Sequence, residues 1–337
     1  MNVRRHRFVR VVAFVASLLL CFAWHAHADY EPGRGLPLFH DRLTIGGYVA
    51  VDAAFLDDSR DELVVDDLSA FLTLRLTDHW LLFTEAELED PVHIESGGFG
   101  SGDHLFNLER LYSQWLAGEH VRLRIGQMLT PFGIWNVIHA EPLVWTSSRP
   151  IATAEFFDTS VTGMEATLFA PVTAFDLIIT AFGQVTPQID DSHDPQKARR
   201  AVGARAEAGT SSGVRVGASV VHFHDHVDHR DETTFGVDAF WTARLVELSS
   251  EIAINAPDSG HATGGGYAQI VWHAGLNLHP FVRVEYVDLR GFDRVPVVFG
   301  AAWKPYDAIV FKLEGILGGD DTSLGGDGVL SSFSMLF

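Results

Sequence analysis

The chain has 337 residues, of which 47% are hydrophobic, and 44 acidic against 24 basic residues give a formal net charge of −20. This charge excludes nucleic acid as a partner, because nucleic-acid binding needs a basic surface. The hydrophobic content excludes a disordered acidic segment, and a single cysteine excludes a disulfide framework.

The first 28 residues have the three parts of a secretory signal peptide. Four arginines precede the apolar run 11–22, which is too short to span a membrane as a helix, and Ala26-His27-Ala28 provides a cleavage site. We therefore expect an exported chain of residues 29–337. Loss of the four arginines would move the net charge from −20 to −24, because residues 1–28 contain no acidic residue.

From residue 41 onward, apolar and polar residues alternate in segments of about ten residues that are separated by turn residues. This pattern is typical of the strands of a transmembrane β-barrel, whereas a soluble domain of this length would show long amphipathic helices. The alternation predicts about sixteen strands, an even number as single-chain bacterial barrels require. They are 41–56, 65–77, 79–89, 106–117, 121–128, 161–170, 173–184, 199–209, 213–224, 232–244, 246–256, 264–274, 278–289, 295–304, 306–317 and 329–337.

The connections between these segments alternate strictly between short and long. Outer-membrane barrels have short periplasmic turns and longer extracellular loops, so both termini should be periplasmic. The long connections are 57–64, 90–105, 129–160, 185–198, 225–231, 257–263, 290–294 and 318–328.

The two faces of the strands differ in polarity. In 246–256, Leu248, Ile252 and Ile254 lie on one face, and Glu247 and Glu251 on the other. A charge that faces lipid costs about 2–4 kcal/mol, so the charged face should line a water-filled lumen.

The segment 121–136 reads VRLRIGQMLTPFGIWN. It resembles the G-Q/K-x-x-x-P-F-G segment of phosphate-selective-type porins, with Gly126, Gln127, Pro131, Phe132 and Gly133 at the matching positions. The rest of the chain resembles the wider porin superfamily by its pattern. The resemblance implies an outer-membrane pore, usually a homotrimer, whose longest loop narrows the channel.

The last nine residues, VLSSFSMLF, resemble the terminal strand of outer-membrane barrels, in which the final aromatic residue is part of the assembly signal. Alternation assigns Phe333, Met335 and Phe337 to lipid, and Ser332 and Ser334 to the channel.

The longest connection, 129–160, is the predicted constriction loop. Pro131 cannot donate to a sheet and Gly133 can turn the chain sharply, so the pair should end a strand and bend the chain inward. The alternative is an ordinary extracellular loop that packs on the rim. The ionisable residues that we expect at the constriction are Glu141, Arg149, Glu155 and Asp158.

Basic and acidic residues on the predicted lumen face nearly balance, so most of the negative charge should lie in the loops. Opposed rows of acids and bases would orient dipolar solutes and screen ions, or they would merely neutralise one another. Phosphate selectivity is not supported, because the chain has too few basic residues for a dense basic ladder. The lumen charges are Arg75, Arg122, Arg124, Arg205, Arg215, Arg244, Arg283 and Lys312, with Asp52, Glu85, Glu87, Glu207, Asp238, Glu247, Glu251, Glu285 and Glu314.

Three further patterns could indicate a function, but for each of them we prefer a purely structural interpretation. The densest ligand-like cluster, His222, His224, His226 and His229, could hold a transition metal, but solvated loop histidines explain it better. A rim-site hydrolase would need a dyad such as His193 with Asp190, and the chain has no catalytic motif. Aromatic residues near strand ends should form interfacial girdles rather than a carbohydrate-binding track inside the pore. They are Trp80, Tyr112, Trp115, Phe240, Trp241, Trp272, Trp303 and Tyr306.

The sequence therefore predicts an all-β transmembrane antiparallel barrel of about sixteen strands with a long loop folded into the lumen. We expect a porin for passive diffusion of small hydrophilic solutes and ions, favouring cations, without enzymatic activity, cofactor or metal. Its partners would be outer-membrane lipid, lipopolysaccharide and further copies of itself in a homotrimer. The alternatives are a substrate-specific channel for an anion, sugar or organic acid, and a non-porin barrel that serves as an adhesin or envelope scaffold.

Overall fold

The computed structural model describes residues 33–57, 61–95, 98–100, 106–138, 140–186, 198–289, 292–319 and 322–337. The predicted signal peptide, residues 1–28, and the candidate dyad of His193 and Asp190 lie outside these ranges. Helices that combine the length and apolarity needed to cross a membrane are absent from the described residues.

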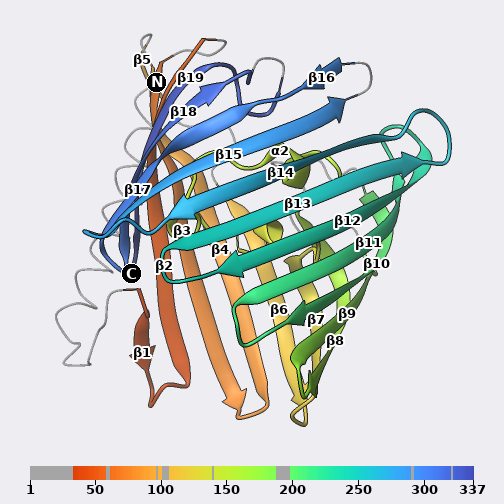
Figure 1. Cartoon of the computed structure of the whole chain (residues 1–337). Coiled ribbons are helices and arrows are strands. Elements are labelled where there is room, and N and C mark those ends of the chain that lie inside the picture. Colours follow the sequence, from red (N-terminus) through yellow and green to blue (C-terminus); the bar gives the residue numbers. More distant parts are fainter. Residues whose placement is uncertain are drawn as a thin grey trace, which may run out of the picture.

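The described strands form one antiparallel sheet of 19 strands whose order closes on itself. Three of them are short: β1 (Leu36–Leu38), β5 (Gly98–Gly100) and β16 (Phe292–Arg294). The other sixteen build a closed barrel, which confirms the predicted fold class (Figure 1). They are β2 (Leu43–Leu56), β3 (Glu62–Thr77), β4 (Trp80–Glu95), β6 (Asn107–Ala117), β7 (Val121–Leu129), β8 (Ser160–Val172), β9 (Phe175–Gln184), β10 (Ala198–Gly209), β11 (Val214–Asp225), β12 (Arg230–Thr242), β13 (Val246–Pro257), β14 (Thr263–Trp272), β15 (Leu278–Leu289), β17 (Val297–Tyr306), β18 (Ile309–Leu317) and β19 (Gly328–Leu336).

Each predicted strand corresponds to one long strand of the barrel. The largest difference is the first hairpin, where β3 begins at Glu62 and β4 ends at Glu95, and these two residues pair. The added part of β4 begins with Asp90 and Pro91, which are typical turn residues, so the sequence alone indicates a loop there.

The last strand closes the barrel against the first long strand, from Gly328 opposite Leu56 to Leu336 opposite Tyr48. Beyond it, the Phe337 N–H donates to the Gly47 carbonyl at 2.8 Å, and the Gly47 N–H donates to the Phe337 carbonyl at 3.0 Å. The ring of Phe337 covers Gly47, where a Cβ atom would approach it to 2.7 Å. A glycine therefore makes room for the terminal aromatic ring.

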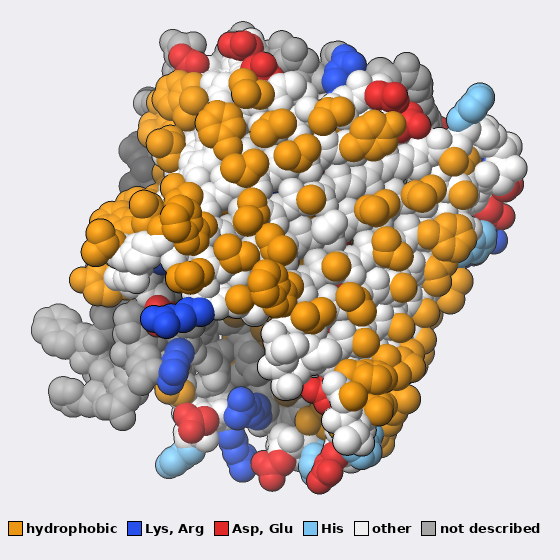
Figure 2. Space-filling model, in the orientation of Figure 1, with side chains coloured by type: hydrophobic (Ala, Val, Ile, Leu, Met, Phe, Trp, Pro, Cys, Tyr) orange, Lys and Arg blue, Asp and Glu red, His pale blue; other side chains and the backbone are white. Residues whose placement is uncertain are grey.

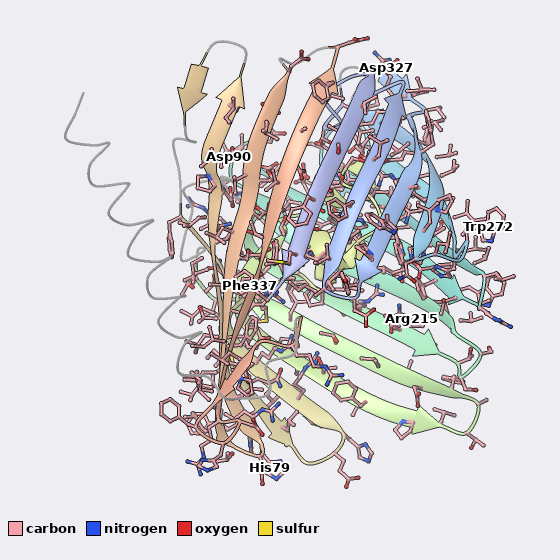
Figure 3. All side chains as sticks on the ribbon, turned by 90° about the vertical axis from the view of Figure 1, so that its left-hand side faces the viewer. His79, Asp90, Arg215, Trp272, Asp327 and Phe337 are labelled. Atoms are coloured by element: carbon pink, nitrogen blue, oxygen red, sulfur yellow. The ribbon has the colours of Figure 1, made fainter. Side chains whose placement is uncertain are left out.

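The connections alternate between short turns and longer loops around the barrel, as predicted. We call the two ends the short-turn end and the long-loop end. Figure 3 shows His79, in a short turn, and Asp327, in a long loop, at opposite ends of the molecule.

The inner face is polar and the outer face apolar, the inverse of a soluble barrel. On β13, Glu251 is buried inside while Ile252 and Ile254 are exposed outside. On β19, Ser332 and Ser334 are buried inside and Val329 is exposed. Figure 2 shows hydrophobic side chains spread over the outer wall, with charged side chains gathered towards its two ends.

Five exposed tryptophans lie on the outer face near the short-turn end, which fits the predicted girdle. They are Trp80, Trp115, Trp241, Trp272 and Trp303.

Two predicted girdle residues, Tyr112 and Phe240, instead lie on the lumen face. Tyr112 stacks on Phe83 with ring centroids 5.2 Å apart, and the guanidinium of Arg215 lies 4.5 Å from the Phe240 ring. The reason is strand alternation: Phe240 adjoins the outward Trp241 and must point the other way.

Candidate functional site

Residues 130–159 connect β7 to β8 and fold into the barrel, as predicted for the longest loop. They contain the short helices η1 (Trp135–Val137), η2 (Glu141–Leu143) and α2 (Ile151–Ala154). Figure 1 shows α2 within the curve of the sheet. We call residues 130–159 the inner loop.

At the beginning of the inner loop, the backbone of Gly133 lies very close to the barrel wall. Gly133 has φ +63°, and a Cβ atom there would lie 1.8 Å from Oε2 of Glu251. Phe132 before it is buried, packs on Phe157 with centroids 4.2 Å apart, and covers Gly236. Glycine at 133 provides both the left-handed backbone and the missing side chain.

Three carboxylates on distant strands accept hydrogen bonds from the loop backbone. Glu251 on β13 accepts from the N–H groups of Ile134 (2.9 Å) and Trp135 (2.8 Å). Glu314 on β18 accepts from those of Ser147 (3.0 Å) and Ser148 (2.9 Å). Glu285 on β15 likewise accepts from the N–H group of Ile151 at 2.8 Å. Hydrogen bonds to an ionised acceptor are about twice as strong as neutral ones, so these contacts fix the loop firmly on this wall.

Two buried cations hold the same loop through its oxygens. Arg283 pairs with Glu285 at 2.7 Å and donates to Oγ1 of Thr146 (2.8 Å) and to the carbonyl of Ser148 (2.9 Å). Lys312 pairs with Glu141 and donates to the carbonyl of Thr146 at 3.1 Å. Six of the predicted lumen charges therefore contact the inner loop, because Glu247 also accepts from the Trp145 indole at 2.6 Å. The other five are Glu251, Arg283, Glu285, Lys312 and Glu314.

Two of the four ionisable loop residues that we expect at the constriction are held by partners. Glu141 is buried against Lys312. Arg149 donates to Oδ1 of Asn136 at 2.9 Å and to the carbonyl of Thr153 at 2.5 Å, within the loop itself. Sequence reasoning could not find these partners, because alternation says nothing about contacts between a loop and distant strands.

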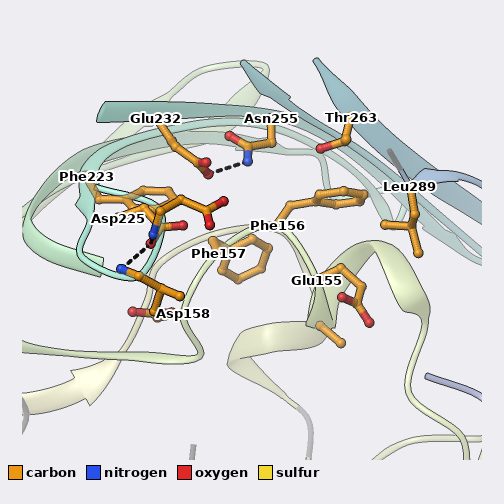
Figure 4. A pocket seen from close by; sticks show the side chains of 13 residues that line it. Glu155, Phe156, Phe157, Asp158, Phe223, Asp225, Glu232, Asn255, Thr263 and Leu289 are labelled. Atoms are coloured by element: carbon orange, nitrogen blue, oxygen red, sulfur yellow. Dashed lines mark hydrogen bonds between the residues drawn. The ribbon is translucent and has the colours of Figure 1, made fainter. Parts of the chain in front are cut away.

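Glu155 and Asp158 face the long-loop end, around a pocket of about 450 Å³ (Figure 4). The same pocket is lined by Asp225, Asp228 and Glu232. Asn255 donates to Glu232 at 2.5 Å, and Ala198 N–H donates to Asp158 at 2.8 Å. These carboxylates make this side of the inner loop strongly acidic.

Asp225, Asp228 and Glu232 place ligand-type oxygen atoms within 4.8 Å of one another. Arg230 supplies a positive charge there, since it pairs with Glu232 at 2.5 Å and with Asp228 at 3.0 Å.

The candidate metal histidines are not part of this group in the described residues. His222 and His224 point to the outer face and bond to Thr233 at 3.0 Å and Asp231 at 2.7 Å. The spacing that suggested a metal site therefore gives two separate contacts on the outside of the barrel.

The surface that the inner loop leaves exposed is apolar. Val137, Ile138 and Leu143 retain 41%, 37% and 51% of their accessible surface. The loop directs its acids to the wall or to the long-loop end, keeps Arg149 in contacts within itself, and exposes aliphatic side chains inside the barrel. Sequence reasoning missed this, because it weighed only ionisable groups at the constriction.

The inner wall of β2, β3, β4 and β6 is acidic. Glu87 accepts from the hydroxyls of Tyr48 (3.0 Å) and Ser69 (2.7 Å), and Glu85 pairs with Arg110. The acids of this wall are Asp52, Asp66, Asp67, Glu85, Glu87, Glu89 and Glu109.

The sequence missed Asp66 and Asp67 because of a bulge. The register of β3 shifts between Val65 and Asp67. Both Val64 and Ser69 are buried inside, although simple alternation would place them on opposite faces. The bulge thus brings two consecutive aspartates to the inner side.

The predicted arginines lie on the neighbouring wall, and most are paired. Arg122 and Arg124 share Glu165 at 3.3 and 3.6 Å. Arg205 pairs with Asp238 at 2.5 Å and with Glu207 at 3.0 Å. Arg75 is exposed near the short-turn end of β3, and Arg244 lies in a short turn. Arg75 and Arg244 therefore place positive charge at the short-turn end, whose turns also contain acidic residues. The carboxylates around the pocket in Figure 4 place negative charge at the long-loop end.

Known proteins match this chain by structure and not by sequence. No family model and no curated protein matches it. Among solved structures, Salmonella typhi OmpF in complex with daunomycin is 12% identical, with a TM-score of 0.61 over 88% of this chain and 97% of that one. The anion-selective porin from Comamonas acidovorans is 14% identical, with a TM-score of 0.59 over 88% and 99%.

The chain has the porin fold. A trimer form of OmpT, an outer membrane protein of Vibrio cholerae, is also similar, at 12% identity and a TM-score of 0.57 over 87% and 97% of the two chains. At 12–14% identity these neighbours show the fold alone. They do not confirm the phosphate-selective-type family.

Proposed function

We propose that the chain is an outer-membrane porin through which small hydrophilic solutes and ions diffuse passively, with a preference for cations. The observation that carries this proposal is the inner loop. It is anchored to the wall of β13, β15 and β18, and an acidic wall on β2 to β6 remains on the other side of the barrel. A loop held in this way narrows a channel without closing it.

The porin fold supports the location as well as the pore. On this reading residues 1–28 direct export, the short-turn end faces the periplasm and the long-loop end faces the medium. The apolar outer wall would contact lipid, and the loops would contact lipopolysaccharide. A homotrimer is the expected assembly, by analogy with the trimer form of Vibrio cholerae OmpT.

Cation preference follows from where the charges lie. A cation that enters from the long-loop end meets the carboxylates around Glu155 and Asp225, and then those of Asp66 and Asp67. Walls of one sign raise the local concentration of the opposite ion. The arginines deeper in the pore are largely neutralised by Glu165 and Asp238. The similar porin from Comamonas acidovorans is anion-selective, so the fold by itself does not decide the sign.

The pore is tested with refolded chain 29–337 in planar lipid bilayers. We expect discrete conductance steps that do not depend on an added substrate. Folding is checked separately by the strand signal in circular dichroism. Folded protein that inserts and never conducts would contradict the proposal and would favour an adhesin or envelope scaffold.

A further inference from the structure

We propose that a pocket beneath the inner loop binds one neutral sugar ring, so that this porin takes up sugars with a site of its own. The inference rests on the proposed porin function and gives that channel a substrate class. The pocket has a volume of about 200 Å³ and lies between the inner loop and the inner face of β11 to β14. Its loop residues are Ile134, Trp135, Ile138, Leu143, Val144 and Trp145.

The wall of this pocket is a row of side chains at matching positions on four adjacent strands. Arg215 on β11 is opposite Phe240 on β12, which is opposite Ser249 on β13, which is opposite Gln269 on β14. Because these strands share one register, the four side chains form a continuous strip on the lumen face. The strip lies towards the short-turn end, below the loop.

Two tryptophans of the inner loop form the other side. The indole N–H of Trp145 donates to Oε1 of Glu247 at 2.6 Å, and the backbone N–H of Trp135 donates to Glu251 at 2.8 Å. Both rings therefore line the pocket from fixed positions. Unlike the girdle tryptophans, these two lie inside the barrel, where lipid cannot explain them.

Two polar groups in the strip can still form hydrogen bonds with a ligand. Oε1 of Gln269 is buried and has no hydrogen-bond partner among the described residues. A buried acceptor without a partner costs about 1–3 kcal/mol, so a ligand hydroxyl that donates to it would be favoured. The guanidinium of Arg215 stacks on Phe240 and forms neither a hydrogen bond nor an ion pair within the described part of the chain.

The combination of groups selects a neutral polyhydroxylated ring. Arg215 and Glu247 carry opposite charges, so a singly charged solute would meet one repulsive partner. A hydroxyl group can accept from Arg215 and donate to Glu247 or Gln269, whereas an ion can do only one of these. Each indole ring carries a cation, because Lys304 Nζ lies 4.5 Å from the Trp145 centroid and Arg149 Cζ lies 5.4 Å from that of Trp135. The part of each ring that lines the pocket suits the apolar C–H face of a sugar ring, and pockets of this mixed character bind small ligands.

Glucose block of the ionic current tests the inference in channels that already conduct. We expect glucose to reduce the current of single channels in a concentration-dependent manner, and the acyclic polyol sorbitol to do so more weakly because it offers no rigid ring face. Trp145→Ala and Gln269→Ala should each weaken glucose binding about tenfold, which corresponds to about 1.4 kcal/mol. Trp303→Ala removes an outer-face tryptophan and serves as the matched control, with unchanged block.

A zwitterionic amino acid is the competing ligand, because it could also satisfy Arg215 and Glu247. Glu247→Gln separates the two, since an amide oxygen still accepts from the Trp145 indole and from a hydroxyl but no longer attracts an ammonium group. Glucose block should survive this change within about twofold. Loss of glucose block in Glu247→Gln, or stronger block of the wild type by leucine than by glucose, would overturn the sugar assignment.

Failure of the sugar proposal can be distinguished from failure of the porin proposal. Channels that conduct but show no glucose block would end the sugar proposal and leave the porin proposal intact. If folded protein does not conduct, glucose binding can still be measured in detergent micelles by the quenching of tryptophan fluorescence. In that assay too, Trp145→Ala should shift the response to about tenfold higher glucose concentration, and Trp303→Ala should leave it unchanged.

Discussion

Gly133 shows how a single position sets the path of the inner loop. The sequence identified it as a turn residue after Pro131, because glycine there suits a sharp bend. The structure adds that Glu251 occupies the space of a side chain. That contact joins residues 118 positions apart, which no local pattern can reveal.

We expect Gly133→Ala to destabilise the barrel by at least about 1–2 kcal/mol, the cost of a left-handed backbone at a residue with a side chain. The added methyl group must also displace Glu251. Urea unfolding in detergent micelles measures the change. Gly183→Ala is the control, because a Cβ atom there meets nothing within 4 Å. Equal midpoints for the two variants would show that the inner loop tolerates a side chain at 133.

Lys312 and Glu141 show that a sequence does not reveal which charged residues remain exposed to the channel. Alternation placed Lys312 in the lumen, and loop length placed Glu141 nearby, but their burial together is a property of the folded loop. Neither residue contributes a free charge to the channel.

Lys312→Met should therefore destabilise the protein by about 3–5 kcal/mol, because it leaves Glu141 as a buried charge without its cation. The double variant Lys312→Met with Glu141→Gln should recover much of this loss. The free energies of unfolding of the single and double variants check the coupling. Additive losses in the two single variants would mean that the pair is not coupled.

At the scale of elements, the strands and the inner loop differ in how far the sequence predicts them. Each strand carries its own evidence in alternation and turn residues, so all sixteen were predictable. The inner loop carries only its length and the turn at residues 131–133. Which wall it packs on is decided by Glu251, Glu285 and Glu314, whose role appears only when the barrel is closed.

Replacing residues 131–158 with a short glycine-containing turn should raise the single-channel conductance, since Leu129 and Ser160 are already paired and can carry a hairpin. The wider lumen of the shortened protein would conduct more current. Shortening 258–262, an outer loop, is the control and should leave conductance unchanged. Equal conductance in all three proteins would mean that the inner loop does not narrow the path.

At the scale of the whole molecule, acidic residues gather at the long-loop end and on the wall of β2, β3, β4 and β6. The sequence predicts that most of the negative charge lies in the long loops and that acids and bases nearly balance within the lumen. The structure shifts that balance, because the bulge in β3 adds Asp66 and Asp67 while several arginines are neutralised by partners. The predicted loop acids Glu155 and Asp158 lie around the acidic pocket at the long-loop end.

The double variant Asp66→Asn with Asp67→Asn should reduce cation preference, because it removes two wall charges without changing side-chain volume. The effect should be largest at low ionic strength, since salt screens charges beyond about 10 Å at 0.1 M. Glu141→Gln is the matched control, and we expect little change because that carboxylate is buried beside Lys312. A larger effect of Glu141→Gln than of the aspartate pair would place the selective charge on the inner loop after all.

The reversal potential of the wild-type channel in a potassium chloride gradient tests cation preference most directly. Cations that diffuse preferentially through an acidic pore leave the dilute side positive, and that sign is the expected result. A dilute side that becomes negative would show anion preference and would contradict the assignment of selectivity to the acidic wall.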